Sequence, residues 1–458
     1  MWPTSVFFSC TLYPGIGPPR AGGRRIPTQL IDVRTPVDRV VLVGAPARSL
    51  ARDLADEHLL ELGRLTDTAG GHVVGSVVQR IDTPHARFYL GEGKARELAT
   101  VVEETEADLV VFDEELSPAQ GRNLEELLGV RVVDRSELIL DIFATRARSK
   151  EARMQVELAQ LQYLLPRLRR MWTHLSRIRG GIGLRGPGET QIETDRRLIS
   201  KRIGDLRRKM KEVAKARAAQ RRGREGNFRA ALVGYTNAGK SSLLRGLSGS
   251  DLFVEDRLFA TLDSATRVVE LGSGHEALIT DTVGFIRKLP HHLVASFRST
   301  LEEAGEADVL LHVIDGSHRD WEEHYEVVLE VLAELGMEER DCVLVFNKVD
   351  RLSDEQEEAL RTRVRAFDPT PAVFVSAHNP VTLDALRDTL RARLQRRLAR
   401  VVVHVPASDG QTISTLYREA EVTGRVDDSM RVSLTARVPT ELLGRLSSRD
   451  GVVIEEMA

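Results

Sequence analysis

The sequence has little cysteine, no long apolar run and no signal-peptide pattern, and each absence excludes a class of protein. Its two cysteines, Cys10 and Cys342, lie in different contexts among 458 residues, so neither a disulfide framework nor a cysteine zinc site is expected. No stretch approaches the roughly 20 consecutive apolar residues of a membrane-spanning helix. The N-terminus has a short apolar piece without a basic region before it, which predicts a flexible tail over residues 1–37. These features favour a protein of the reducing cytoplasm.

The chain also lacks a strong net charge, but its charge is unevenly distributed. Residues 146–225 carry 23 Lys and Arg against 8 Asp and Glu, a net charge of +15, whereas the remainder carries −18. Such a basic segment favours a polyanionic partner, because it attracts phosphate backbones whatever the overall charge. The alternative is a solvated pair of helices with ordinary surface arginine and lysine, and composition alone slightly favours that alternative.

Hydrophobic patterns divide the chain into four folded parts, within the three or four domains expected for its length. Strand and helix patterns alternate over residues 38–145 and again over 226–399, which predicts two α/β domains with mostly parallel sheets. Over residues 146–225, apolar residues step by four and three on both sides of a glycine-rich stretch, which predicts an antiparallel helical hairpin. Short strands around a helix predict a small α+β domain over residues 400–458. The expected fold class is a multidomain α/β protein.

The strongest chemical motif is ALVGYTNAGKSSLL, in which Gly234 and Gly239-Lys240-Ser241 fit the pattern G-x-x-x-x-G-K-[ST]. The motif follows a predicted strand and opens a predicted helix, the context of a P-loop. Its glycines let backbone N–H groups converge on phosphate oxygens, and the helix N-terminus adds partial positive charge. Lys240 is expected to reach the β- and γ-phosphates, and Ser241 to bind Mg²⁺.

Three further motifs indicate the nucleotide and the reaction. DTVG ends a strand at Asp281, which is expected to hold Mg²⁺, commonly through water, while the N–H of Gly284 contacts the γ-phosphate. NKVD over residues 347–350 offers a carboxylate that accepts two hydrogen bonds from guanine, and SAH over residues 376–378 is expected to meet the guanine O6. Adenine would leave that carboxylate unpaired, which discriminates by about 10⁴-fold. The order and spacing predict a GTPase.

With the glycine-rich stretch and the N-terminal LGEGKARELA, these motifs resemble the HflX family of ribosome-associated GTPases from about residue 38 onwards. The resemblance implies FATLD over residues 259–263 as switch I, with Thr261 as a second Mg²⁺ ligand. It also implies a P-loop GTPase domain with helices on both faces of its sheet. The implied partner is the large (50S-type) ribosomal subunit with its rRNA, and the implied role is to split stalled or idle ribosomes. The chain is then expected to be monomeric and cytoplasmic, or at membranes through ribosomes.

The candidate site residues fall into overlapping groups. The residues expected to act in catalysis are Lys240, Thr261, Asp281 and Gly284, and the metal ligands are Ser241 and Thr261. The residues expected to contact GTP are Gly234, Tyr235, Thr236, Asn237, Ala238, Gly239, Lys240, Ser241, Phe259, Ala260, Thr261, Leu262, Asp263, Asp281, Thr282, Val283, Gly284, Asn347, Lys348, Val349, Asp350, Ser376, Ala377 and His378.

Two positions bear on the rate of hydrolysis. Phe285 stands where many GTPases carry a glutamine that orients the attacking water, so we expect slow turnover alone and stimulation by a partner such as the ribosome. Asn237 either shapes the turn or places K⁺ near the phosphates, and both interpretations stay open.

A non-catalytic ribosome- or RNA-binding scaffold that uses GTP structurally is one rival function. An ATP-driven RNA remodeller is a second, which the guanine motifs disfavour.

Two glycine-rich segments outside the P-loop are weaker candidates. Gly91, Gly93 and Lys94 precede a predicted helix and could bind ATP in the N-terminal domain, although a turn before a basic helix is the favoured interpretation. The stretch GGIGLRGPGETQIETDRR contains G-x-G-x-x-G, but a helix rather than a strand precedes it, so it does not fit a dinucleotide loop. We expect it to form the hairpin tip, with RNA-contact candidates Arg179, Arg185, Arg196 and Arg197.

Overall fold

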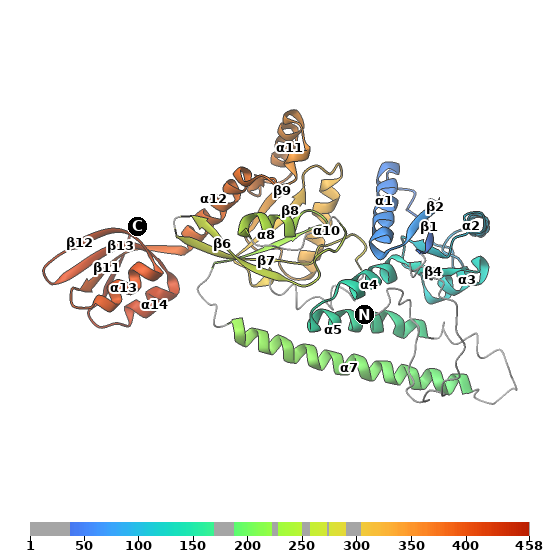
Figure 1. Ribbon diagram of the computed structural model, residues 1–458, viewed down its shortest axis with the longest axis horizontal. Coiled ribbons are helices and arrows are strands. Elements are labelled where there is room, and N and C mark those ends of the chain that lie inside the picture. The colour runs from blue at the N-terminus through green and yellow to red at the C-terminus, as the bar shows by residue number, and fades with distance from the viewer. Residues whose placement is uncertain are drawn as a thin grey trace, which may run out of the picture. The chain divides into compact units, whose positions relative to one another are not determined.

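The computed structural model describes residues 37–168, 187–221, 228–249, 257–272, 274–289 and 304–457 (Figure 1). These residues form two compact units, which divide between Asp134 and Arg135. No helix within these ranges is long and apolar enough to cross a bilayer. Arg179, Arg185 and the first part of the glycine-rich stretch, residues 180–186, lie outside the described residues.

The first unit is a four-stranded parallel sheet in the order β2-β1-β3-β4. Its central strands β1 and β3 are short runs rich in valine and are buried almost throughout, as in a parallel sheet covered by helices, whereas the edge strand β2 is largely exposed. The core joins Val41 and Val110 of the sheet to Leu98 and Leu124 of the helices. The elements are β1 (Arg39–Gly44), α1 (Arg52–Ala69), β2 (His72–Val78), α2 (Glu92–Glu104), β3 (Leu109–Phe112), α3 (Pro118–Leu128) and β4 (Arg131–Asp134).

The second unit begins with α4 (Arg135–Arg146), which ends where the basic segment begins. The described helices of the basic segment are α5 (Lys150–Leu164) and α7 (Pro187–Arg221). Met154 and Leu158 of α5 pack against Ile203 and Leu206 of α7, so the predicted apolar seam does join two helices. Pro166 interrupts the first helix of the pair, as expected for a proline inside a helical pattern. The last α-helical residue of α5 is Leu164, and a 3-10 turn follows because proline at 166 lacks the N–H that an α-helix needs.

The part of the second unit that follows α7 has a six-stranded sheet in the order β10-β9-β8-β5-β7-β6. All neighbours are parallel except β6, which pairs antiparallel with β7 at the edge. Helices α8 and α12 pack on one face, and α10 and α11 on the other. The elements are β5 (Arg229–Gly234), α8 (Lys240–Ser248), β6 (Ala265–Gly272), β7 (His275–Asp281), β8 (Val309–Asp315), α10 (Trp321–Glu334), β9 (Cys342–Asn347), the 3-10 helix η3 (Val349–Arg351), α11 (Asp354–Phe367), β10 (Ala372–Phe374) and α12 (Pro380–Arg397).

The C-terminal part is an antiparallel sheet in the order β12-β13-β11-β14, with the chain order βαββαβ of a ferredoxin-like fold. Its core alternates along β11 and β13, where every second residue is buried against the helices. The elements are β11 (Leu398–Pro406), α13 (Gly410–Glu419), β12 (Glu421–Asp427), β13 (Arg431–Pro439), α14 (Thr440–Ser447) and β14 (Val453–Glu456).

Candidate active site

The phosphate-binding loop connects β5 to α8, as the P-loop motif predicts. Gly239 has a φ of 92°, and a Cβ there would overlap the side-chain amide of Asn347, so the position requires glycine. The Lys240 side chain is buried, and its Nζ donates to the carbonyl oxygens of Gly234 at 3.1 Å and Tyr235 at 2.9 Å. Burial lowers the pKa of Lys240 to about 8. The ammonium therefore lies at the helix N-terminus, where phosphates are favoured.

Three side-chain oxygens converge beside this loop from three parts of the chain. Ser241 Oγ donates to Asp281 Oδ2 at 2.6 Å and lies 2.6 Å from Thr261 Oγ1. Burial raises the pKa of Asp281, and its buried Oδ1 has no hydrogen-bond partner among the described residues. Mg²⁺ prefers such hard oxygen ligands, and a cation here would compensate the buried carboxylate. These residues therefore fit Mg²⁺.

The DTVG segment lies directly against the phosphate-binding loop. Phe285 N donates to Gly234 O at 3.0 Å, and Thr236 N donates to Phe285 O at 2.6 Å. A Cβ on Gly284 would lie 2.7 Å from Thr236 Cα and 3.0 Å from Lys240 Nζ, so this close approach also requires glycine. The Phe285 side chain is buried and apolar, and it offers no group to orient a water molecule.

A pocket lies between the phosphate-binding loop, the FATLD segment predicted as switch I and the DTVG segment. Asn237 lines it with a φ of 57°, consistent with a role in shaping the turn. Two of its residues, Ser242 and Arg257, were not among the predicted site residues, since they lie just outside the motifs. The lining is Thr236, Asn237, Gly239, Lys240, Ser241, Ser242, Arg257, Phe259, Ala260, Thr261, Thr282 and Gly284.

The predicted guanine-binding motifs are joined by hydrogen bonds through Asn347. Its Nδ2 donates to Ala238 O at 2.9 Å, and its Oδ1 accepts from Ala377 N at 3.1 Å. Ser376 is buried and its N–H donates to Thr382 Oγ1, while Asp350 is exposed at η3. The loops after β5, β9 and β10 are therefore fixed together at one edge of the sheet, where ligands bind in open α/β folds.

Sequence reasoning missed Asp315, which ends β8 beside the NKVD motif. Its Oδ2 lies 2.7 Å from Lys348 Nζ, and both side chains are mostly shielded from solvent. Burial opposes ionisation of Asp315, but the Lys348 ammonium and hydrogen bonds from Lys348 and Ser317 hold its pKa below the usual range. The pair orients the lysine of the motif. A buried strand that ends in aspartate was a visible signal for such a partner.

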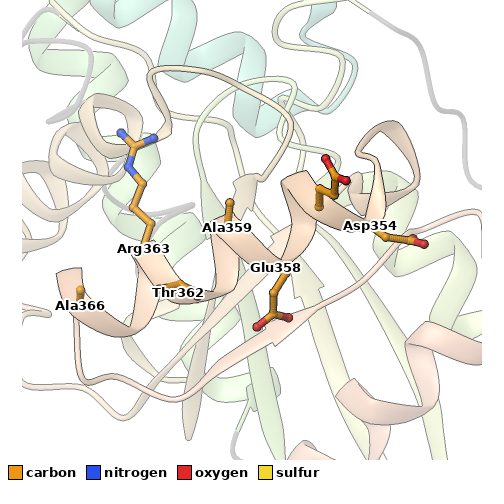
Figure 2. A pocket seen from close by; sticks show the side chains of 7 residues that line it. Asp354, Glu358, Ala359, Thr362, Arg363 and Ala366 are labelled. Atoms are coloured by element: carbon orange, nitrogen blue, oxygen red, sulfur yellow. The ribbon is translucent and has the colours of Figure 1, made fainter.

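Two other features are less suited to binding phosphates. Lys94 forms an ion pair with Glu97 of its own helix at 2.7 Å, and Gly91 N donates to Gln79 Oε1, so this segment is a helix start held by local bonds. A shallow hollow along α11 is shown in Figure 2, with its residues spaced along one helix face. Three carboxylates among them would repel a phosphate. Its lining is Asp354, Glu355, Glu358, Ala359, Thr362, Arg363 and Ala366.

Family models and known proteins match this chain over most of its length. Family models match three consecutive segments, described as a GTP-binding GTPase N-terminal region over residues 56–144, a GTP-binding GTPase middle region over 146–224 and a 50S ribosome-binding GTPase over 229–348. The GTPase HflX of Alkalihalophilus pseudofirmus is 44% identical over 399 residues, which cover 86% of this chain and 92% of that protein.

Two further relatives give the same result over similar lengths. The GTPase HflX of Magnetococcus marinus is 43% identical over 432 residues, which cover 93% of this chain and 99% of that protein. The GTPase HflX of Escherichia coli is 41% identical over 405 residues, which cover 87% and 94%. The chain is therefore a GTP-binding and GTP-hydrolysing enzyme and belongs to the HflX family of GTPases.

Proposed function

We propose that this GTPase binds the large ribosomal subunit in its GTP state and splits stalled or idle ribosomes. The observation that carries the proposal is the basic surface of α7. Its apolar side packs on α5, which leaves nine cationic side chains exposed against four acidic residues in the same described part of the helix. The cations are Arg196, Arg197, Lys201, Arg202, Arg207, Arg208, Lys209, Lys211 and Lys215, and the acids are Glu193, Asp195, Asp205 and Glu212.

Such a surface suits the phosphate backbone of rRNA, because cations that neutralise phosphates release counterions and so strengthen binding. The family model described as a 50S ribosome-binding GTPase supports the same partner. Arg196 and Arg197 lie on this surface. The other two predicted RNA contacts, Arg179 and Arg185, belong to the proposed tip of the hairpin.

The active site would work as a nucleotide switch. Lys240 holds the β- and γ-phosphates, while Thr261 and the N–H of Gly284 hold the two switch segments against the γ-phosphate side. Mg²⁺ bound by Ser241 and Thr261, with Asp281 behind them, would neutralise charge that develops on the phosphates. Loss of the γ-phosphate releases both segments. This order–disorder change would control binding to the ribosome.

Turnover is expected to be slow without the ribosome. The buried Phe285 cannot orient a water molecule, so the partner would complete the site, and partner-supplied groups can add about 10³–10⁵ in rate. Asn237 lines the phosphate pocket, and a comparison of turnover in equal KCl and NaCl separates a K⁺ ligand from a turn residue.

The test measures GTP turnover and binding with and without large subunits over a range of salt concentrations. We expect strong stimulation and a steep salt dependence, and Lys211→Glu with Arg207→Glu should reduce the salt slope by about one for each phosphate that is no longer neutralised. The matched control is Arg365→Glu with Arg396→Glu, two exposed cations on α11 and α12. Equal turnover with and without subunits, or equal effects of both pairs, contradicts the proposal.

Two variants address the rival functions. A Lys240→Ala protein that still splits ribosomes would favour a scaffold that needs GTP only for its structure. Competition of unlabelled ATP with labelled GTP tests the RNA remodeller, and ATP should fail to compete because its base lacks the hydrogen-bond pattern that Asp350 accepts.

A further inference from the structure

The switch I segment, residues 259–263, contacts the active site and also the start of helix α5. Asp263 is two residues beyond Thr261, and its carboxylate does not face the phosphate-binding loop. Its Oδ2 accepts from the backbone N–H groups of Arg148 and Ser149, each at 3.1 Å, and its Oδ1 accepts from Ser149 Oγ. Asp263 is therefore bound to the N-terminus of α5, the first long helix of the hairpin.

This contact is well suited to a carboxylate. Three donors converge on one charged group, and hydrogen bonds to a charged acceptor are about twice as strong as neutral ones. The partial positive charge of the helix N-terminus adds to the attraction. Ser149 is also the N-cap of α5, since its Oγ accepts from Ala152 N at 3.0 Å, so one hydroxyl serves both the helix and the switch segment.

A second contact holds the other end of the same segment. The ring of Phe259 lies edge-on to Phe143 of α4, with ring centroids 4.7 Å apart, and both rings are buried. Phe259 N also donates to Thr236 Oγ1 of the phosphate-binding loop at 3.0 Å. Residues 259, 261 and 263 thus contact α4, the oxygen cluster of the active site and α5 in turn.

The short chain between these contacts couples them. Two residues span at most about 7 Å, so Thr261 cannot move far from the active site while Asp263 stays bound to α5. The converse also holds, because withdrawal of Thr261 pulls on the bonds between Asp263 and the helix. A contact that stabilises one of these arrangements stabilises the other.

We propose that Asp263 is a positioning residue for GTP hydrolysis, which holds Thr261 at the active site through the N-terminus of α5 and so links nucleotide state to the helical hairpin. The proposal rests on the role of Thr261 in the proposed GTP state. The link continues into the hairpin, since α5 packs on α7 and Glu157 forms an ion pair with Arg202 at 2.7 Å. Contact of the basic α7 surface with a polyanion can thereby act on switch I.

The first experiment measures basal turnover and GDP affinity of the full chain carrying Asp263→Ala. We expect kcat to fall about tenfold or more, because one hydrogen bond to a charged group is equivalent to at least that change in an equilibrium. GDP affinity should change less than twofold, since GDP binding does not require Thr261. The control is Asp409→Ala, which removes an aspartate whose carboxylate also accepts a hydrogen bond from a helix N-terminus, that of α13, and it should leave both quantities unchanged.

A second pair of variants covers the case in which Asp263→Ala fails to fold. Ser149→Ala removes one of the three donors and should lower kcat about fivefold, whereas Ser149→Thr keeps the hydroxyl and should restore it. Helix content and melting temperature of both proteins show whether each variant is folded. A parallel loss of kcat and GDP affinity would mean that the contact only stabilises the fold, and it would overturn the proposal.

Hydrogen exchange gives a readout that does not depend on activity. The amide protons of Arg148 and Ser149 should exchange more slowly with a non-hydrolysable GTP analogue than with GDP, and Asp263→Ala should abolish the difference. Equal protection in both nucleotide states refutes the link. Thr261→Ala separates the proposed nucleotide switch from the proposed role of Asp263. An unchanged kcat in Thr261→Ala would refute the switch itself. A low kcat in Thr261→Ala together with a normal kcat in Asp263→Ala would refute only the role of Asp263.

Discussion

Removal of the Asn347 side chain should uncouple the phosphate-binding loop from the guanine-binding loops. This amide is almost fully buried, with 1% of its surface exposed, and it joins Ala238 O to Ala377 N through two hydrogen bonds. Asn347→Ala leaves that carbonyl and that N–H without their partner. Because both bonds come from one side chain, a single substitution removes both.

The size of the effect follows from the two groups left unpaired. Each costs about 1–3 kcal/mol if it stays buried, so the total is about 2–6 kcal/mol. For a protein part of this size, 1 kcal/mol corresponds to about 2–4 °C in Tm, so the nucleotide-free protein should lose at least about 4 °C. Loss of alignment between the loops should also weaken GDP binding by about tenfold or more, since each 1.4 kcal/mol is tenfold in affinity.

Thermal melting and titration with a fluorescent GDP derivative measure the two quantities. The matched control is Asn123→Ala in the first unit, where an exposed amide donates to Arg87 O at 2.9 Å and its loss should be small. A Tm within about 1 °C of the wild type together with a GDP affinity within about twofold would refute this expectation, because changes this small are typical of an ordinary surface substitution.

Three further predictions concern neighbouring positions. Asp315→Asn should destabilise the protein above about pH 4 and progressively less at lower pH. The pKa of Asp315 is lower in the folded than in the unfolded protein, so its stabilisation is fully present above the unfolded pKa and is lost as the pH falls through the folded pKa. Tm measured from about pH 2 to 6 checks this. Asp350→Asn should weaken GTP binding by about 10- to 100-fold and favour xanthosine triphosphate, whose 2-oxo group accepts from the new amide, as competition binding would reveal. Gly284→Ala should cost about 1–3 kcal/mol, since its Cβ meets the Thr236 backbone at 2.7 Å, and should slow turnover more than it weakens GDP binding.

Local patterns were sufficient to predict the central strands and the loops that follow them. The buried strands β5, β8 and β9 are short apolar runs, and the P-loop and NKVD motifs follow β5 and β9. The pattern missed β6, because an edge strand with one solvent-facing side has no continuous apolar run. It also missed α14, a helix of 8 residues that lies between two strands.

Contacts between distant parts of the chain could not be predicted in the same way. Lys348 and Asp315 are 33 residues apart, and Asp263 is 114 residues from Ser149. No periodicity or motif links such positions, because only the sheet order and the packing of α5 bring them together. The oxygen cluster of Ser241, Thr261 and Asp281 differs in this respect. The P-loop and DTVG motifs pointed to Ser241 and Asp281, whereas Thr261 was expected only from the family resemblance.

The polar bonds beyond the strand ends affect how variants of this site are interpreted. The apolar core of a parallel sheet ends where its strands end, so the loops beyond it must be held by polar side chains. Here Asn347 and Lys348 belong to the guanine motif and are also bonded to Ala238 O and Asp315. A substitution in either residue therefore removes a structural bond as well as a ligand contact. Loss of turnover alone cannot separate the lost structural bond from the lost ligand contact. The Tm of the nucleotide-free protein reports only the structural bond, so turnover and Tm must both be measured on every variant of this site.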